Sequence, residues 1–100
     1  MSNFWTGAVP RFAPEDFTEG ERLHARYRWP VSYDELRPYY ERVERLLLVS
    51  GSPCDLPTLP ANAVAHPYTL PPDWQRIAPA AEAAGHGFTP MPLALNASAR

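Results

Sequence analysis

Thirteen of the 100 residues are proline, and this constrains the fold more than any other feature of the sequence. Each proline removes a backbone hydrogen-bond donor and fixes one dihedral angle, so long helices and central strands are disfavoured over much of the chain. Apolar residues make up 45% of the chain and aromatic residues 12%, which is enough to bury a modest core. We therefore expect many short segments that need to pack against a larger structure.

The charge balance and the single cysteine exclude several function classes. The formal net charge is −2 and no basic stripe is present, so we expect no nucleic-acid partner. Cys54 alone can form neither an internal disulfide nor a multi-thiolate metal site, and the spacing of His24, His66 and His86 fits no ligand motif. We expect no metal site. No membrane-spanning run and no signal peptide are visible, which favours a cytoplasmic location.

The clearest helical pattern runs from Ser32 to Val49. Ser32 and Glu35 have the spacing of a capping box, in which the hydroxyl serves one orphan amide and the carboxylate another. Proline is tolerated only in the first turn of a helix, so Pro38 predicts a short turn over residues 33–36 and a main helix from about residue 38.

This helix carries one apolar stripe, at i, i+4, i+7 and i+8, formed by Tyr39, Val43, Leu46 and Leu47. The stripe either docks a partner helix or packs on the rest of its own protein; the second is favoured because amphipathic helices are generic. Ser50 and Gly51 are expected to end the helix, with Gly51 as a left-handed cap.

Residues 52–72 form a proline-rich connection, and loops of that length tend to be functional or ordered by other parts. A second helix is expected to open at Pro72, to end near Ala84 before Gly85, and to break or kink at Pro79. Residues 88–95 read as an extended edge or irregular strand.

The residues themselves identify no catalytic group. The neighbouring carboxylates of residues 15–16 and 34–35 are typical of capping and solvation, because general acid–base work needs groups on opposite sides of a reacting atom. No strand–turn–helix context surrounds a serine, and the five glycines are scattered, so neither a nucleophile elbow nor a phosphate-binding loop is present.

Four stretches together carry a resemblance. Residues 29–51 contain W-P-V-S-Y-D-E-L, P-Y-Y, E-R-L-L and V-S-G, which is similar to the W-P-[IV]-S-Y-[DE]-[DE]-L-x-P-Y-Y…E-R-L-x-x-V-S-G run of bacterial glucose-methanol-choline (GMC) oxidoreductases. Residues 5–17 resemble the family's W-x-G-x-x-P-R-F-x-P-x-D-F stretch, and residues 68–72 and 91–96 its Y-x-L-P-P and P-L-A-[IL]-N segments. The resemblance covers essentially the whole chain and points to the sugar and alcohol dehydrogenase or pyranose oxidase-like branch.

The resemblance implies an internal piece of the substrate-side domain of an FAD enzyme with an α+β fold. In such enzymes hydride passes from the CH–OH group of a sugar or alcohol to the flavin, while a histidine removes the hydroxyl proton. The family's G-x-G-x-x-G and its catalytic histidine region are both missing here, so the chain is expected to be inactive alone, with the remainder of the flavoenzyme as its partner. The implied division is a flavin-proximal aromatic segment (1–31), a helix (32–51), a proline-rich loop (52–72), and a helix with an extended segment (73–100).

Cofactor contact is implied only at the start of the chain, where residues 2–7 resemble the second half of a G-G-x-S-x-x-[WN]-G segment that passes the flavin. The candidate FAD contacts are Ser2, Asn3, Trp5 and Thr6; for Trp5, simple packing is an equal alternative. Pyranose oxidase-like members carry a flavin-linked histidine where this chain has Phe4, so no covalent link is expected there. Met1 falls where relatives have an internal residue, which suggests a mis-assigned start or a truncated reading frame.

Taken alone, the chain should form two short helices, at about 33–49 and 73–84, with irregular segments and one or two short strands. Two other functions stay open: a non-enzymatic helical binding module, and a small accessory subunit of a dehydrogenase complex. For a fragment we expect no flavin absorbance and little cooperative unfolding, because six early aromatic residues lack packing partners. They are Phe4, Trp5, Phe12, Phe17, Tyr27 and Trp29.

Overall fold

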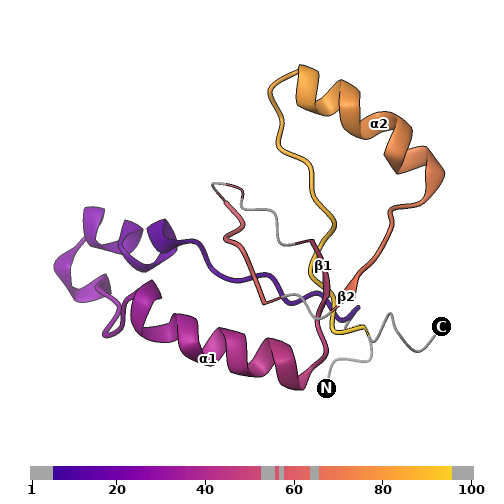
Figure 1. Ribbon diagram of the computed structural model, residues 1–100. Coiled ribbons are helices and arrows are strands. Elements are labelled where there is room, and N and C mark those ends of the chain that lie inside the picture. Colours follow the sequence, from indigo (N-terminus) through magenta and orange to yellow (C-terminus); the bar gives the residue numbers. More distant parts are fainter. Residues whose placement is uncertain (1–5, 53–55, 57, 64–65, 96–100) are drawn as a thin grey trace.

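The computed structural model describes residues 6–52, 56, 58–63 and 66–95 (Figure 1). Within these residues it contains three short 3-10 helices, two α-helices and a two-stranded sheet. In chain order they are η1 (Pro14–Phe17), η2 (Glu19–Arg22), η3 (Ala25–Tyr27), α1 (Tyr33–Leu46), β1 (Ser50–Gly51), β2 (His66–Pro67) and α2 (Pro72–Ala83). The α+β class with two short helices, short strands and irregular segments is confirmed. Neither α-helix combines the length and the apolar character that crossing a bilayer requires.

The sheet lies where distant parts of the chain meet. β1 and β2 run parallel, with Ser50 opposite His66. Leu93 forms antiparallel bridges to Ser50 on one side and to Ala8 on the other. The backbone amides of Ser50 and Leu93 each donate to the other's carbonyl, at 2.8 and 2.9 Å. The segment expected to be extended over residues 88–95 is therefore bonded to its neighbours at Leu93.

The most tightly buried part of the molecule surrounds these bridges. Val49, Ser50 and Pro92 are its fully buried side chains. A Cβ on Gly51 would lie 3.2 Å from the Cα of Pro92, so glycine lets two backbone segments approach closely. Gly51 thus serves the sheet, and its expected role as a left-handed helix cap is wrong.

The start of α1 follows the predicted capping box. The hydroxyl of Ser32 accepts from the amide of Glu35 at 3.2 Å, and the Glu35 carboxylate accepts from the amide of Ser32 at 2.7 Å. The expected interruption before Pro38 is wrong, because α1 is continuous from Tyr33 to Leu46. Pro38 is exposed, so the carbonyl that loses its helical partner is left on the side that water reaches.

The end of α1 differs from the expected one at Val49. The amide of Val49 donates to the carbonyl of Glu44 at 3.0 Å and that of Leu48 to Arg45 at 3.3 Å, which is the bonding pattern of a Schellman cap. The left-handed position of this cap is Leu48, with φ +51°. A leucine therefore stands where glycine is usual, and the helix ends three residues earlier than the sequence suggested.

Helix α2 ends as predicted, at a glycine. Gly85 has φ +86°, and the amides of Gly85 and His86 close a second cap onto the last turn. The break or kink expected at Pro79 does not interrupt the helix. Helix α2 lies away from α1 (Figure 1). The ring of Trp74 on α2 contacts the ring of Phe88, with 6.2 Å between their centroids.

Aromatic residues of the N-terminal segment pack on one another. The ring of Phe17 lies 4.8 Å from Trp29 and 6.2 Å from Tyr33, and Phe12 lies 5.6 Å from Trp29. Phe17 is buried, whereas Phe12 and Trp29 stay 54% and 40% exposed. The expectation that the early aromatic residues lack partners is wrong for Phe12, Phe17 and Trp29, and for Tyr27, whose ring lies 6.2 Å from that of His24. Phe4 and Trp5 lie outside the described residues.

Candidate functional site

A buried ion pair between Arg11 and Glu44 joins the N-terminal segment to α1. The Nε and Nη2 atoms of Arg11 donate to the two carboxylate oxygens of Glu44, both at 2.7 Å. The side chains are only 3% and 5% exposed, and the two bonds are parallel in the manner of a fork. A pair with this geometry fixes both position and orientation, and it bridges residues 33 positions apart in the chain.

Further groups satisfy the rest of this pair. Arg11 Nη1 donates to the hydroxyl of Tyr33 at 3.1 Å, and its guanidinium lies 5.5 Å from the centre of the Tyr40 ring. The amide of Ala63 donates to Glu44 at 2.8 Å. The hydrogen bond from Arg11 to Glu44 raises the already high pKa of the guanidinium, so Arg11 is charged at every pH at which the protein is folded.

Local structure brings these groups together. Arg11 follows an extended stretch anchored by the bridge at Ala8 and precedes η1, whose first turn is closed by the Asp16 carboxylate accepting from the amide of Ala13 at 2.7 Å. Glu44 lies on the same face of α1 as Tyr33 and Tyr40, the side turned toward the N-terminal segment. The loop at residues 58–63 closes the arrangement through Ala63.

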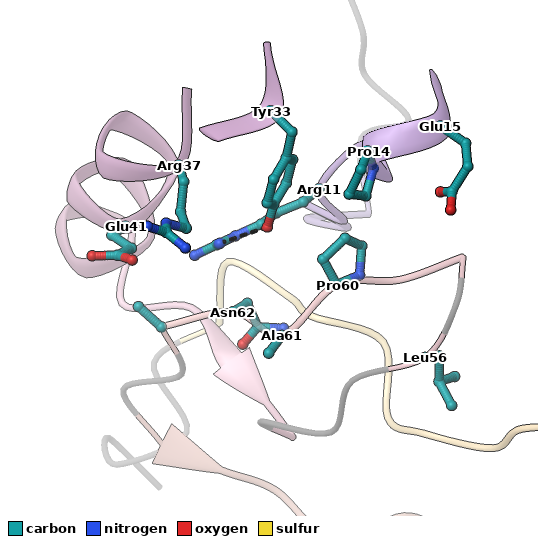
Figure 2. A pocket seen from close by; sticks show the side chains of 11 residues that line it. Arg11, Pro14, Glu15, Tyr33, Arg37, Glu41, Leu56, Pro60, Ala61 and Asn62 are labelled. Atoms are coloured by element: carbon teal, nitrogen blue, oxygen red, sulfur yellow. Dashed lines mark hydrogen bonds between the residues drawn. The ribbon is translucent and has the colours of Figure 1, made fainter. Parts of the chain in front are cut away.

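An open pocket of about 750 Å³ lies beside Arg11 (Figure 2). Its lining consists of Arg11, Pro14, Glu15, Tyr33, Arg37, Glu41, Leu56, Pro60, Ala61, Asn62 and Ala63. Two arginines and two glutamates line it, and the charge of Arg11 is already paired with that of Glu44. The Asn62 Oδ1 atom is buried and accepts no hydrogen bond from the described residues.

A second hollow of about 530 Å³ borders the first, and both include Tyr33 and Pro14. Its aromatic wall is formed by Phe17, Trp29 and Tyr33. Its polar rim includes Glu21 and Arg28, which are paired at 2.7 Å. This pairing raises the pKa of Arg28.

The arrangement around Arg11 is suited to holding the chain together and unsuited to acid–base chemistry. A guanidinium does not release its proton in proteins. Both oxygens of Glu44 are engaged by three donors, from Arg11 and Ala63, so neither is free to take a proton from a substrate. Among the residues that the structure describes, no three His, Cys, Asp or Glu side chains gather at a separation that would hold a metal ion.

The structure describes only one of the four predicted cofactor contacts. Ser2, Asn3 and Trp5 lie outside the described residues, and Thr6 is exposed. Thr6 lines neither of the two pockets. The residue after it, Gly7, has φ +85°, and its carbonyl accepts from the amide of Ala94 at 2.7 Å. Glycine is required by that backbone conformation, and the contact anchors the end of the candidate segment.

Sequence reasoning missed the pair itself. Arg11 and Glu44 stand in two of the stretches that carry the family resemblance, but nothing in one sequence says that they meet. The available signal was position: Arg11 lies between apolar neighbours, and Glu44 lies at i+4 from the aromatic Tyr40.

Comparison with known proteins places the chain beside oxidoreductases. It is 36% identical over 99 residues to a 6'''-hydroxyparomomycin C oxidase of Streptomyces lividus and 35% identical over 96 residues to a paromamine 6'-oxidase of Streptomyces fradiae. Each alignment covers 93% of this chain, but only 18% and 17% of the relative. A 2-methyl-1,2-propanediol dehydrogenase of Mycolicibacterium austroafricanum is 39% identical over 49 residues, 47% of this chain and 9% of the relative.

No protein-family model and no solved structure matches the chain. The chain spans less than a fifth of the length of the curated relatives that it matches. All three relatives bear the names of oxidoreductases, two of oxidases and one of a dehydrogenase. The chain is therefore similar, over most of its own length, to one segment of much longer oxidoreductases.

Proposed function

We propose that this chain is a segment of the substrate-side domain of an FAD-dependent GMC oxidoreductase that oxidises the CH–OH group of a sugar or another alcohol. The observation that carries the proposal is the alignment of 93% of the chain with two oxidases at 35–36% identity. Their names place the oxidised compounds among paromamine-type molecules, so a hydroxyl of a sugar-like ring is the substrate class that we favour.

The geometry supports the proposal because it brings the stretches of the family resemblance into one unit. Ala8 of the first stretch bridges to Leu93 of the last, and Leu93 bridges to Ser50 at the end of the central one. Arg11 and Glu44 join the first and central stretches a second time.

In this proposal the chain contributes position rather than chemistry. The bound cofactor would accept the hydride, and no residue of this chain is assigned a catalytic role. Ser2, Asn3, Trp5 and Thr6 would hold its edge; of these, Thr6 is exposed and its segment is anchored at Gly7. The Arg11–Glu44 pair keeps this segment in register with α1.

A segment replacement tests the proposal. The aligned segment of the Streptomyces lividus oxidase is replaced by this chain, and the purified protein is examined for flavin absorbance and for oxidation of that enzyme's substrate. We expect bound flavin and measurable turnover. A variant that carries Arg11→Met in the same replacement should bind less flavin, because loss of the buried pair destabilises the unit that holds the cofactor segment. A soluble, folded replacement without flavin contradicts the proposal.

A further inference from the structure

Helix α1 turns its apolar stripe away from the rest of the described chain. Tyr39, Val43 and Leu46 are 65%, 49% and 79% exposed. These three residues follow i, i+4 and i+7 and so form one surface, which we call the outer face of α1. The opposite side of the helix carries the charge of Glu44 into the interior. A surface helix normally exposes its polar side to water. Helix α1 exposes an apolar side instead, so we expect another polypeptide segment to pack on it.

A second feature of the same helix end points the same way. Leu48 adopts a left-handed conformation that glycine takes without strain, yet its side chain is 40% exposed. Leu47 beside it is 37% exposed. Within the described residues, the strained backbone of Leu48 is therefore not offset by burial of its apolar side chain.

The distribution of exposed apolar residues indicates what kind of partner covers the outer face of α1. Besides the outer face, Phe12 and Trp29 are exposed near η1, and Trp74 and Ile77 are 52% and 49% exposed on α2. In Figure 1, α2 lies apart from α1, whereas the segment around η1 lies beside the start of α1. A two-fold contact with a second copy covers one self-complementary patch, whereas patches on several sides need a polypeptide that surrounds the chain.

The dimensions and the relatives supply such a polypeptide. The radius of gyration is 15.7 Å, against about 13 Å for a compact domain of 100 residues. In the two oxidases that align with 93% of this chain, more than four-fifths of the length lies outside the aligned segment.

We propose that the outer face of α1 docks on the part of an alcohol-oxidising oxidoreductase that lies outside this chain, and not on a second copy of it. The proposal rests on the function proposed above and adds the surface through which the segment is held. Arg42 lies next to the outer face, is exposed, and forms no ion pair within the described residues. The covering surface should therefore be apolar, with an acidic group or a carbonyl opposite Arg42.

The test uses the 100-residue chain and a defined probe, the Streptomyces lividus oxidase with its aligned segment deleted. The two proteins are co-expressed and captured through a tag on the chain. The test variant is Val43→Glu with Leu46→Glu. The control is Arg45→Glu, which changes the charge by the same two units on the solvated side of the same helix. We expect the parent chain and the control to capture the deleted oxidase and the test variant to capture at least tenfold less.

The other outcomes are equally decisive. Equal capture by the parent, the test variant and the control overturns the proposal, as does sedimentation showing a discrete dimer of the chain that Val43→Glu dissociates. If the deleted oxidase is insoluble, the same substitutions are made in the segment replacement described above. The test variant must then lower the yield of soluble enzyme at least tenfold relative to the control, and equal yields overturn the proposal. Capture without bound flavin leaves the docking surface in place and contradicts the proposed function instead.

Discussion

Replacing one member of the Arg11–Glu44 pair should remove most of the stability of the chain. In Arg11→Met the Glu44 carboxylate stays buried but keeps only the amide of Ala63 as a donor. The side chains are 3% and 5% exposed, so water cannot replace the lost partner without opening the structure. Leaving one charge of a buried pair without its partner costs about 3–5 kcal/mol, which lowers the ratio of folded to unfolded chain roughly a hundredfold or more.

That loss is large against the stability available. Folded domains are typically stable by about 5–15 kcal/mol. The fully or nearly buried apolar residues among those described are few, and Ala13, Phe17 and Val49 form the core that the structure shows. We therefore expect the parent chain near the lower limit, and Arg11→Met to keep only about 0–2 kcal/mol of stability.

The measurement is urea unfolding followed by helical ellipticity, which reports mainly on α1 and α2. The double variant Arg11→Met with Glu44→Leu provides the control, because it removes both charges. It should be more stable than Arg11→Met alone and lie within about 1–3 kcal/mol of the parent, the amide of Ala63 having lost its acceptor. If Arg11→Met costs under about 1 kcal/mol, as at an exposed pair, or if the two substitutions simply add, the reasoning is wrong.

Three further predictions concern local structure. Leu48→Gly should stabilise the isolated chain by about 0.5–1 kcal/mol, since relief of left-handed strain outweighs the added freedom of the unfolded chain; a lower urea midpoint would refute this. Gly20→Ala should lower that midpoint by the equivalent of about 1–3 kcal/mol, because the new Cβ would lie 2.9 Å from the Tyr27 carbonyl oxygen; an unchanged midpoint contradicts it. The amide of Ser32 lowers the pKa of Glu35 from its ordinary 4.5, so the capping contribution is present above that value and is lost as pH falls through the lower pKa of the folded chain. Helical ellipticity below pH 4.5 should fall more in the parent than in Glu35→Gln, and parallel curves would count against the cap.

Local signals predicted the start of α1 and the end of α2, but not the breaks expected at Pro38 and Pro79, which are absent from these two helices. The capping box at Ser32 and Glu35 and the glycine end of α2 at Gly85 both follow from side-chain chemistry within a few residues, and both are confirmed. The end of α1 could not be placed, because the hydrogen bonds of its cap form at Leu48, a residue that seldom adopts the conformation required. Gly51 gave a stronger signal for a turn, but it is required by the close approach of Pro92.

The candidate site depends on contacts between distant residues, and these leave little trace in a single sequence. Arg11 and Glu44 are 33 residues apart, and the segments that carry them are also joined by the bridges that Leu93 makes to Ala8 and Ser50. The mutual packing of Phe12, Phe17 and Trp29 was missed for the same reason. The family resemblance identified which stretches matter, and the structure shows how they meet.

The most direct test of the central claim is the mass and flavin content of the native protein that contains this sequence. Extracts of cells that carry the gene are fractionated by size, flavin absorbance is recorded, and each fraction is probed on a denaturing gel with an antibody to the α2 segment, Pro72–Ala83. We expect one polypeptide several times heavier than the 11.2 kDa of this chain, in the fractions that contain flavin. An 11.2 kDa band that co-elutes with a separate flavoprotein would indicate an accessory subunit, and one free of flavin a binding module; either result would contradict the account.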